Sequence, residues 1–241
     1  MIVSIHQPNF IPWAGFFDKL MHSDVFVLFD DVLFPRGGSY GNRANIKTSS
    51  GTLMLTVPIR STGKEQRLFS EIVIADDNKF QRKTLKSIEF SYCKAPFFKE
   101  LFPEFAETYM KKSGMLIEFN HKLIIFICNL FNRCGVKTPQ IVLSSDIKAQ
   151  GVGEEKIFQL LKTINTTTYI SGQGAGSRRY VREDDFIKNE INLVWQNFVH
   201  PIYTQLYGDF ISGLSIVDML FNCGPNETAR ILSKVKNEDG K

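Results

Sequence analysis

The chain has 241 residues, of which 43% are apolar and 22% are charged, and its formal net charge is +4. These values exclude a disordered chain and are typical of a globular protein with room for a substantial core. Lys and Arg are spread along the sequence without the basic tract of a nucleic-acid-binding protein, and no apolar stretch approaches the ~20 residues that a membrane-spanning helix needs.

Residues 2–34 combine an apolar strand, a polar turn, a short amphipathic helix and a second apolar strand within about 30 residues, which is the length of a compact crossover unit. The polar residues of this unit are His6, Gln7 and Asn9 in the turn and Asp30 and Asp31 after the second strand. If the two strands are parallel neighbours, a right-handed crossover brings these groups to the carboxyl edge of the sheet, where open α/β sheets bind ligands. Because adjacent strand residues point to opposite faces, only one of the two aspartates is expected to face that crevice. The unit is expected to form half of an active site.

Residues 35–52 follow as a long loop rich in Gly, Ser and Asn, and they include Arg36, Asn42 and Arg43. A guanidinium group offers planar, bidentate recognition of phosphate, which makes this loop a candidate anion-binding segment. The alternative is a loop whose arginines are simply solvated.

Residues 53–59 predict a strand that Pro58 confines to a sheet edge or to the strand's end. Residues 61–67 are polar and suit an anion, although they lack the Walker spacing, and residues 72–74 predict a short strand. Between about residues 78 and 134, apolar side chains recur at helical spacing and predict three helices, the last of them apolar on most of its circumference. We expect this block to be a helical insertion or subdomain within a single α/β domain that spans the whole chain.

Short apolar strands return at residues 140–143, 168–170 and 193–195, with helices expected between them. This alternation favours an α/β fold with a mainly parallel sheet flanked by helices. The strand at 168–170 runs into a Gly-rich segment, where backbone amides and guanidinium groups together suit an anion. The polar residues of that segment are Ser171, Arg178 and Arg179.

His200 stands before a proline, so its backbone is pushed towards an extended conformation. Side chains alternate along an extended segment, which places Tyr203 and Gln205 on one face and His200 on the other. The apolar helix expected at residues 214–221 contains Asp218, and a carboxylate in that setting needs a partner such as an arginine or His200.

Several segments resemble those of the WbqC-like proteins, small bacterial proteins often associated with gene clusters for O-antigen and other surface polysaccharides. The segments are HQPNFIPWAGFFDKL, DVFVLFDDV, the pair Asn42 and Arg43, and HPIYTQ, GDF and LSIVDMLFNCGP near the C-terminus. The similarity runs from residue 2 to about residue 232 and is densest at the two ends. It implies a part in making or decorating activated sugars, with acyl or aminoacyl transfer to an amino sugar among the suggestions, and it supplies no catalytic residues.

A second similarity concerns the nucleotidyltransferases and pantothenate synthetases with the H-x-G-H signature. They resemble this chain in a first strand, a Pro-rich turn and a glycine at a helix start. The matching positions here are Trp13, Ala14, Gly15 and Phe16, so both imidazoles that would face the phosphates of ATP are missing. Gly15 would still permit close approach of the backbone to a phosphate.

Together, the residues and the first resemblance predict a transferase that moves an acyl or aminoacyl group to the amine of a nucleotide-linked amino sugar in O-antigen (lipopolysaccharide) biosynthesis. His6 or His200 is the expected general base, because the unperturbed pKa of histidine, ~6.5, suits proton transfer near neutral pH. Asp30 is the third catalytic candidate, as a hydroxyl or metal contact. The expected substrate-binding residues are Gln7, Asn9, Gly15, Asp31, Asn42, Arg43, Ser171, Arg178, Arg179, Tyr203 and Gln205. We expect His6, Asp30, Arg43, Arg178 and His200 to border one cleft.

Two alternatives stay open: an ATP-dependent nucleotidyltransferase or amide ligase related to the H-x-G-H enzymes, and a non-catalytic sugar-nucleotide-binding or scaffold protein. ATP and a divalent metal are the less favoured cofactors, no metal site is predicted, and the sequence identifies neither the acyl donor nor the oligomeric state. The expected partner is a nucleotide-linked amino sugar or another anionic small molecule, with no nucleic acid and no membrane span. Four cysteines without C-x-x-C spacing, and a first strand that directly follows Met1, indicate reduced thiols in a cytoplasmic protein.

Overall fold

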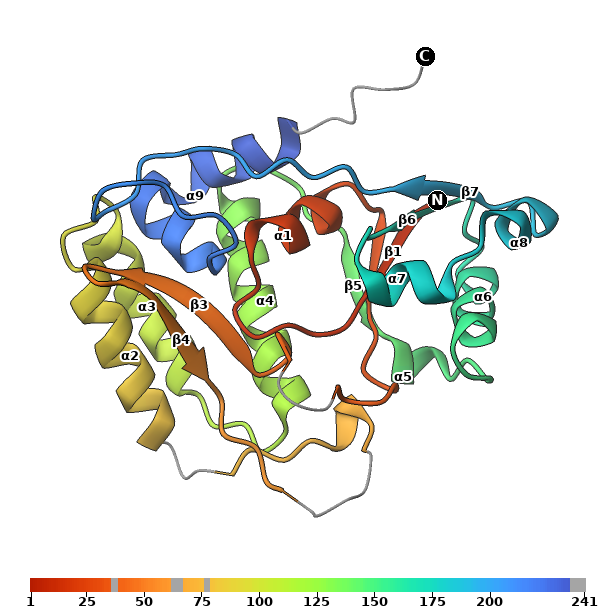
Figure 1. Cartoon of the computed structure of the whole chain (residues 1–241), viewed down its shortest axis with the longest axis horizontal. Coiled ribbons are helices and arrows are strands. Elements are labelled where there is room, and N and C mark those ends of the chain that lie inside the picture. The colour runs from red at the N-terminus through yellow and green to blue at the C-terminus, as the bar shows by residue number, and fades with distance from the viewer. Residues whose placement is uncertain (36–38, 62–66, 76–78, 235–241) are drawn as a thin grey trace.

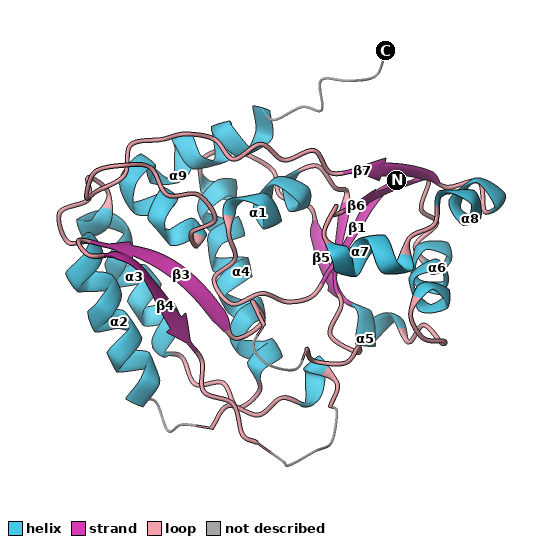
Figure 2. Ribbon diagram, in the orientation of Figure 1, coloured by secondary structure: helices cyan, strands magenta, loops and turns pink. Residues whose placement is uncertain are grey.

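A computed structural model describes residues 1–35, 39–61, 67–75 and 79–234. A five-stranded parallel sheet lies on one side of the molecule, and an antiparallel hairpin with several long helices lies on the other (Figures 1 and 2). The strands of the parallel sheet are β1 (Ile2–His6), β2 (Val25–Leu28), β5 (Gln140–Leu143), β6 (Thr168–Ser171) and β7 (Asn192–Trp195). The predicted α/β fold is therefore confirmed.

The strand order is β5-β2-β1-β6-β7, and all four pairings are parallel. The chain proceeds outward from β1 through β2 to β5, then returns to the other side of β1 and proceeds through β6 to β7. The direction of winding therefore reverses between β1 and β6. The carboxyl ends of the two strands at such a reversal diverge and leave the crevice in which open α/β sheets bind ligands.

Helix α1 (Ala14–Met21) connects β1 to β2 and is buried along almost its whole length. On the sheet side of the molecule lie α5 (Ser144–Ile147), α6 (Glu154–Thr163), α7 (Ala175–Tyr180) and α8 (Glu183–Lys188). Ile157 and Leu160 of α6 and Phe186 of α8 pack with Val3, Ile5 and Val27 of the sheet and form one hydrophobic core.

The predicted helical insertion consists of α2 (Lys79–Tyr92), α3 (Phe98–Met110) and α4 (Leu116–Arg133). Its aromatic side chains pack in a second, larger core with Phe16 and Phe17 of α1 and with the C-terminal helix α9 (Ile216–Lys234). Phe105, for example, contacts Phe126 of α4 and Phe221 of α9 through their rings. The same core reaches α1 and β2, so the insertion and the sheet side share it.

The prediction of a continuous loop over residues 35–52 was wrong in its second half. Residues Arg43–Thr48 form β3, which pairs antiparallel with β4 (Gly51–Thr56). The segment alternates between polar residues and the buried Ala44 and Ile46, a short period-two pattern that its Asn, Arg and Lys side chains concealed. The predicted strand at 53–59 accordingly begins earlier and ends at Thr56.

Two further segments differ from their predictions. Residues 72–74 make only isolated bridges, from Val73 to Met115 and from Ile74 to Ile59, and a short 3-10 turn (Phe69–Glu71) precedes them. The apolar helix expected at residues 214–221 is part of the longer α9, which has a break at Gly224, whose φ is 76°. A Cβ at Gly224 would lie 2.7 Å from the Phe97 ring, so both the backbone and the packing require glycine there.

Arg36 and most of the polar segment 61–67 were candidate anion contacts in the sequence, but Arg36 and residues 62–66 lie outside the described residues. Within the described ranges, no helix combines the length and the apolar character that crossing a membrane would take.

Candidate functional site

His6 ends strand β1 at the carboxyl edge of the sheet. Its Nδ1 lies 2.8 Å from the main-chain oxygen of Gln7, so Nδ1 carries the proton that it donates, and Nε2 keeps a lone pair. The ring packs edge-on against Phe16, with ring centroids 4.9 Å apart. Burial, and to a smaller extent the positive charge of Lys19, lower the pKa of His6 to about 3. The imidazole is therefore neutral at neutral pH and a weak base, which disfavours His6 as the general base.

Lys19 is an unexpected member of this region. It lies on α1, is 2% exposed, and its ammonium donates a hydrogen bond to the main-chain oxygen of Ile5 at 3.0 Å. The main-chain oxygens of Ile2 and His6 accept hydrogen bonds from the β2 side. Successive main-chain oxygens of a strand point alternately to its two neighbours, so the oxygen of Ile5 faces β6. The ladder between β1 and β6 ends one residue before Ile5, so Lys19 occupies the point at which the two strands separate. Burial lowers the pKa of Lys19 to about 7.

The neighbour of Lys19, Asp18, is also buried, and burial raises the pKa of its carboxyl group. Gln196, which follows β7, donates to Asp18 Oδ2 at 2.6 Å and to the main-chain oxygen of Gly15 at 2.8 Å. These bonds fix α1 against the carboxyl end of β7. The sequence signal for both residues is a charged pair inside the otherwise apolar helix AGFFDKLM.

The structure gives Gly15 a different role from the expected phosphate contact. The Trp13 indole folds over the first turn of α1, so that a Cβ on Gly15 would lie 2.3 Å from Trp13 Cη2. The close approach that glycine permits is thus made by an indole ring, which covers the backbone at this point.

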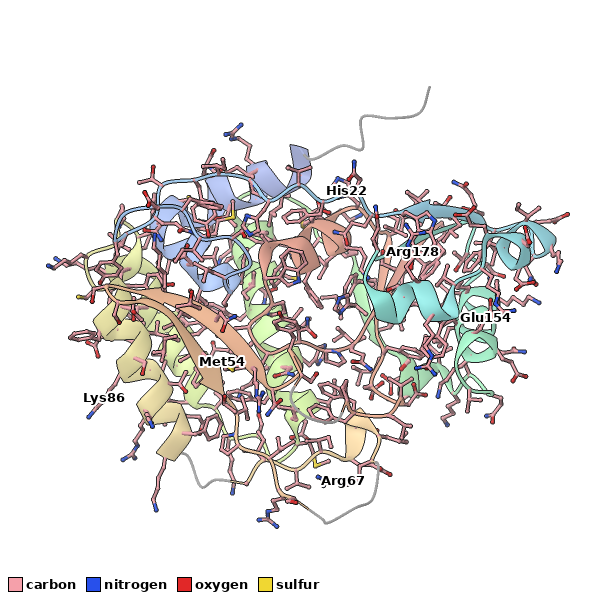
Figure 3. The ribbon with its side chains drawn as sticks, viewed as in Figure 1. His22, Met54, Arg67, Lys86, Glu154 and Arg178 are labelled. Atoms are coloured by element: carbon pink, nitrogen blue, oxygen red, sulfur yellow. The ribbon has the colours of Figure 1, made fainter. Side chains whose placement is uncertain are left out.

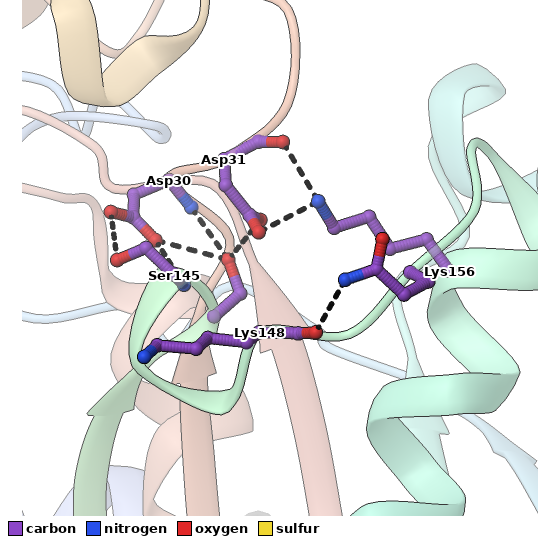
Figure 4. Close-up of polar contacts among 7 residues, drawn as sticks. Asp30, Asp31, Ser145, Lys148 and Lys156 are labelled. Atoms are coloured by element: carbon purple, nitrogen blue, oxygen red, sulfur yellow. Dashed lines mark hydrogen bonds and ion pairs between the residues drawn. The ribbon is translucent and has the colours of Figure 1, made fainter.

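The carboxylates of Asp30 and Asp31 are engaged within the protein (Figure 4). Asp30 is 2% exposed and accepts hydrogen bonds from the Ser144 hydroxyl, and from the amide and the hydroxyl of Ser145, at 2.8 to 3.0 Å. Asp31 forms an ion pair with Lys156 at 2.6 Å and accepts from the Ser144 hydroxyl. The two aspartates therefore hold the end of β2 to the start of α5.

The expectation that only one of these aspartates faces the crevice does not apply. Strand β2 ends at Leu28, so both carboxylates lie beyond the regular pleat, and both reach Ser144. With both oxygens of Asp30 already accepting hydrogen bonds, this carboxylate is poorly placed to act as a catalytic group.

Arg43 opens strand β3 and lines a small pocket together with Asn9, Trp13, Tyr40 and Asn45, which we call the Arg43 pocket. Among the described residues, Arg43 has no acidic partner, and its Nε is buried without a hydrogen-bond acceptor. The side-chain amides of Asn9, which is 7% exposed, and of Asn45 likewise make no hydrogen bond within the described part of the chain. The pocket thus presents a cation and two unused amides between aromatic walls.

Asn42 does not share this arrangement. Its side-chain amide donates to the main-chain oxygen of Val57 at 3.1 Å, and the main-chain amide of Val57 donates to the main-chain oxygen of Asn42 at 2.8 Å. It therefore holds the hairpin in place beside Arg43.

His200 lies on the other side of Trp13, with the two ring centroids 6.3 Å apart. The rings of Phe198, Tyr203 and Phe210 surround it further. Its Nδ1 lies 3.2 Å from the main-chain oxygen of the following proline and donates to it, which leaves Nε2 as a buried acceptor with no partner in the described ranges. Burial lowers the pKa of His200, so the imidazole is neutral at neutral pH.

Tyr203 and Gln205 anchor the His200 segment. Tyr203 and Tyr92 each donate a hydroxyl hydrogen bond to one oxygen of Asp218, at 2.7 and 2.8 Å. Gln205 accepts from the buried ammonium of Lys47 at 3.2 Å. Asp218 therefore accepts from two tyrosines, and among the described residues neither an arginine nor His200 hydrogen-bonds it. Burial raises the pKa of its carboxyl group.

The Gly-rich segment after β6 forms α7 and carries the other two predicted arginines, of which Arg178 is labelled in Figure 3. Arg178 is exposed, and its guanidinium lies 3.9 Å from the centre of the Trp195 ring, while Arg179 lies over the ring of the adjacent tyrosine. Neither forms an ion pair within the part of the chain that the structure describes. Ser171 is fully buried at the end of β6.

The structure thus brings Asn9 and Arg43 together with Trp13, which also contacts His200. Of the five residues expected to border one cleft, only Arg43 lines the Arg43 pocket, and His6, Asp30, Arg178 and His200 do not. Gln7 contributes the main-chain oxygen that fixes the His6 tautomer. Among the described residues, no three His, Cys, Asp or Glu side chains gather as a metal ion would require.

Comparisons with known proteins extend over nearly the whole chain. The sequence profile of the WbqC-like protein family matches residues 7–230. A protein from Mycobacterium tuberculosis, named uncharacterized protein Rv1507c, is 31% identical over 224 residues, which are 92% of this chain and 94% of the mycobacterial one. No solved structure gives a significant match.

Proposed function

This chain belongs to the WbqC-like protein family, and we propose that it is a transferase that moves an acyl or aminoacyl group onto the amine of a nucleotide-linked amino sugar in bacterial surface-glycan biosynthesis. The observation that carries the proposal is the Arg43 pocket, in which a cation without an acidic partner lies beside two unused amides and two aromatic rings. The residues of this pocket fall within the matched range.

The donors of the pocket fit one anionic group of a sugar derivative. The volume of the pocket, about 10 Å³, takes a group of about the size of one water, so the rest of the ligand lies outside it. Leaving a buried guanidinium nitrogen without an acceptor is costly, and a phosphate or carboxylate oxygen would supply the acceptor that the described residues do not. The amides of Asn9 and Asn45 suit sugar hydroxyls, and Trp13 and the exposed Tyr40 offer flat faces for a pyranose or a base. Arg178 and Arg179 remain the predicted contacts for further phosphate oxygens.

His200 is the general base in this proposal. In this proposal the sugar amine reaches past Trp13 from the Arg43 pocket. As it forms its bond to the acyl carbonyl carbon, the buried, unpartnered Nε2 of His200 accepts the proton that the nitrogen loses. The same proton then passes to the leaving group of an activated acyl donor as its bond to the carbonyl carbon breaks. The fixed Nδ1–H holds the ring in the tautomer that this step needs.

Binding tests the pocket first. Titration with UDP-linked amino sugars, followed by calorimetry and thermal shift, should give a dissociation constant that Arg43→Lys weakens about 10- to 100-fold, since a charge-assisted, bidentate contact contributes about 1.5–3 kcal/mol. Arg133→Lys is the matched control, because Arg133 pairs with Glu104 on the helical surface. Equal affinity in the wild type and the Arg43 variant would refute the role of the pocket.

Turnover with a panel of acyl donors then tests the chemistry. His200→Gln should abolish most turnover while the affinity for the sugar nucleotide is kept, and His6→Gln should retain turnover. Release of AMP or pyrophosphate from ATP would instead favour the ligase alternative. Binding of the sugar nucleotide without turnover of any donor would favour a non-catalytic binding protein.

A further inference from the structure

A second concave surface lies away from the Arg43 pocket, between the tip of the β3–β4 hairpin and helix α2. This hairpin groove has a volume of about 780 Å³, which falls within the range of small-molecule sites. Figure 3 shows Lys86, one of its lining residues, on α2 beside the hairpin. None of the residues of the Arg43 pocket lines the groove.

The charge of the hairpin groove is entirely positive. Arg82, Lys83 and Lys86 line it, and none of its lining residues is acidic. These three side chains are exposed and form no ion pair with any residue that the structure describes. Arg82 and Lys86 are four residues apart on one helix face, where like charges repel each other, so an anion placed between them relieves that repulsion.

The remaining lining residues add hydroxyl groups and one aromatic ring. Ser49, Ser50 and Thr52 come from the hairpin, and Ser87 from the same helix as the cations. Phe90 continues the Arg82–Lys86 stripe by one more turn and is 79% exposed, so its ring is available for stacking on the apolar face of a sugar.

We propose that the hairpin groove binds a phosphorylated carbohydrate, with the phosphate between the α2 cations, the sugar hydroxyls on the hairpin serines and threonine, and the sugar ring against Phe90. The concave shape favours a discrete soluble ligand over a flat lipid surface. The site is separate from the Arg43 pocket and does not depend on the function proposed for that pocket.

The test is a two-dimensional amide NMR titration of the whole chain with glucose 1-phosphate, with inorganic phosphate and neutral glucose as comparison probes. Glucose 1-phosphate should cause saturable shifts at hairpin and α2 amides such as Ser49, Ser87 and Phe90. The double variant Lys83→Glu/Lys86→Glu should weaken this binding at least tenfold. Phe90→Ala should weaken glucose 1-phosphate but leave inorganic phosphate unchanged.

The control is Lys94→Glu/Lys99→Glu, which removes two exposed lysines that do not line the groove. It should bind as the wild type does, and Arg43→Lys should also leave the groove shifts intact. Absence of shifts with glucose 1-phosphate, or the same loss in the control variant, would overturn the proposal. Binding of phosphatidylglycerol vesicles through Phe90, without any response to the soluble ligand, would overturn it in favour of a membrane contact.

Discussion

The ammonium of Lys19 hydrogen-bonds the main-chain oxygen of Ile5 at the point where strand β1 parts from strand β6. It occupies a position that a main-chain amide of β6 would fill if the ladder continued. A single acceptor in an apolar setting compensates little of the cost of burying a charge, which is why burial lowers the pKa of Lys19 to about 7.

This burial should make stability depend on pH. Between pH 7 and 10.5 the unfolded chain holds the Lys19 proton and the native chain does not, so the free energy of unfolding should rise with pH across that window, by at most about 5 kcal/mol. Lys19→Met should remove this rise. Denaturant unfolding of both proteins at several pH values measures it, with the exposed Lys99→Met as control. An unchanged slope in Lys19→Met would contradict the assignment.

Gly15→Ala should destabilise the protein by about 1–3 kcal/mol, because the new methyl group must displace the Trp13 indole that lies over the helix. Thermal unfolding measures the loss. Gly176→Ala on α7 is the matched control, since a Cβ there meets no atom within 4 Å. If the two substitutions had the same effect, the packing of Trp13 on Gly15 would not be the reason.

Asp30→Ala should lower the free energy of unfolding by about 1–3 kcal/mol, because Ser144 and Ser145 lose the acceptor that ties α5 to the end of β2. Ligand affinity should stay at the wild-type value. A variant with unchanged stability but weakened ligand binding would restore Asp30 as a direct substrate contact.

Tyr203→Phe should lower stability by about 1–3 kcal/mol, since it leaves one oxygen of the buried Asp218 carboxylate without its donor. The comparison is Tyr207→Phe: the Tyr207 side chain is 37% exposed and its hydroxyl donates to a neutral main-chain oxygen, that of Ser91, so its loss should matter less. Equal losses would mean that the environment of Asp218 is not special. Chemical denaturation at pH 7 gives both values.

The sequence was most informative where one apolar run makes one element. The sequence predicts strands β5, β6 and β7 to within a residue, because each contains a short run of apolar residues between polar segments, although only β6 is mostly buried. Strand β3 is not evident from the sequence, because its two buried apolar residues, Ala44 and Ile46, alternate with polar ones and its third buried residue is Lys47. The candidate site is harder to predict from the sequence, because its contacts join distant parts of the chain. The partners of Asp30 come 114 and 115 positions later. Nothing in the sequence near Lys19 reveals that the main-chain oxygen of Ile5 lacks a strand partner.

The place of Ser215 also sets the order in which the molecule can be completed during synthesis. Its amide donates to the main-chain oxygen of Asn45, its hydroxyl donates to that of Ile11, and it bridges to Trp13. A ribosome extends the chain from its N-terminus, so Trp13 and Arg43 emerge long before the segment that closes over them. Until about residue 215 has left the exit tunnel, the nascent protein lacks Gly213 and Ser215, two of the residues that line the Arg43 pocket.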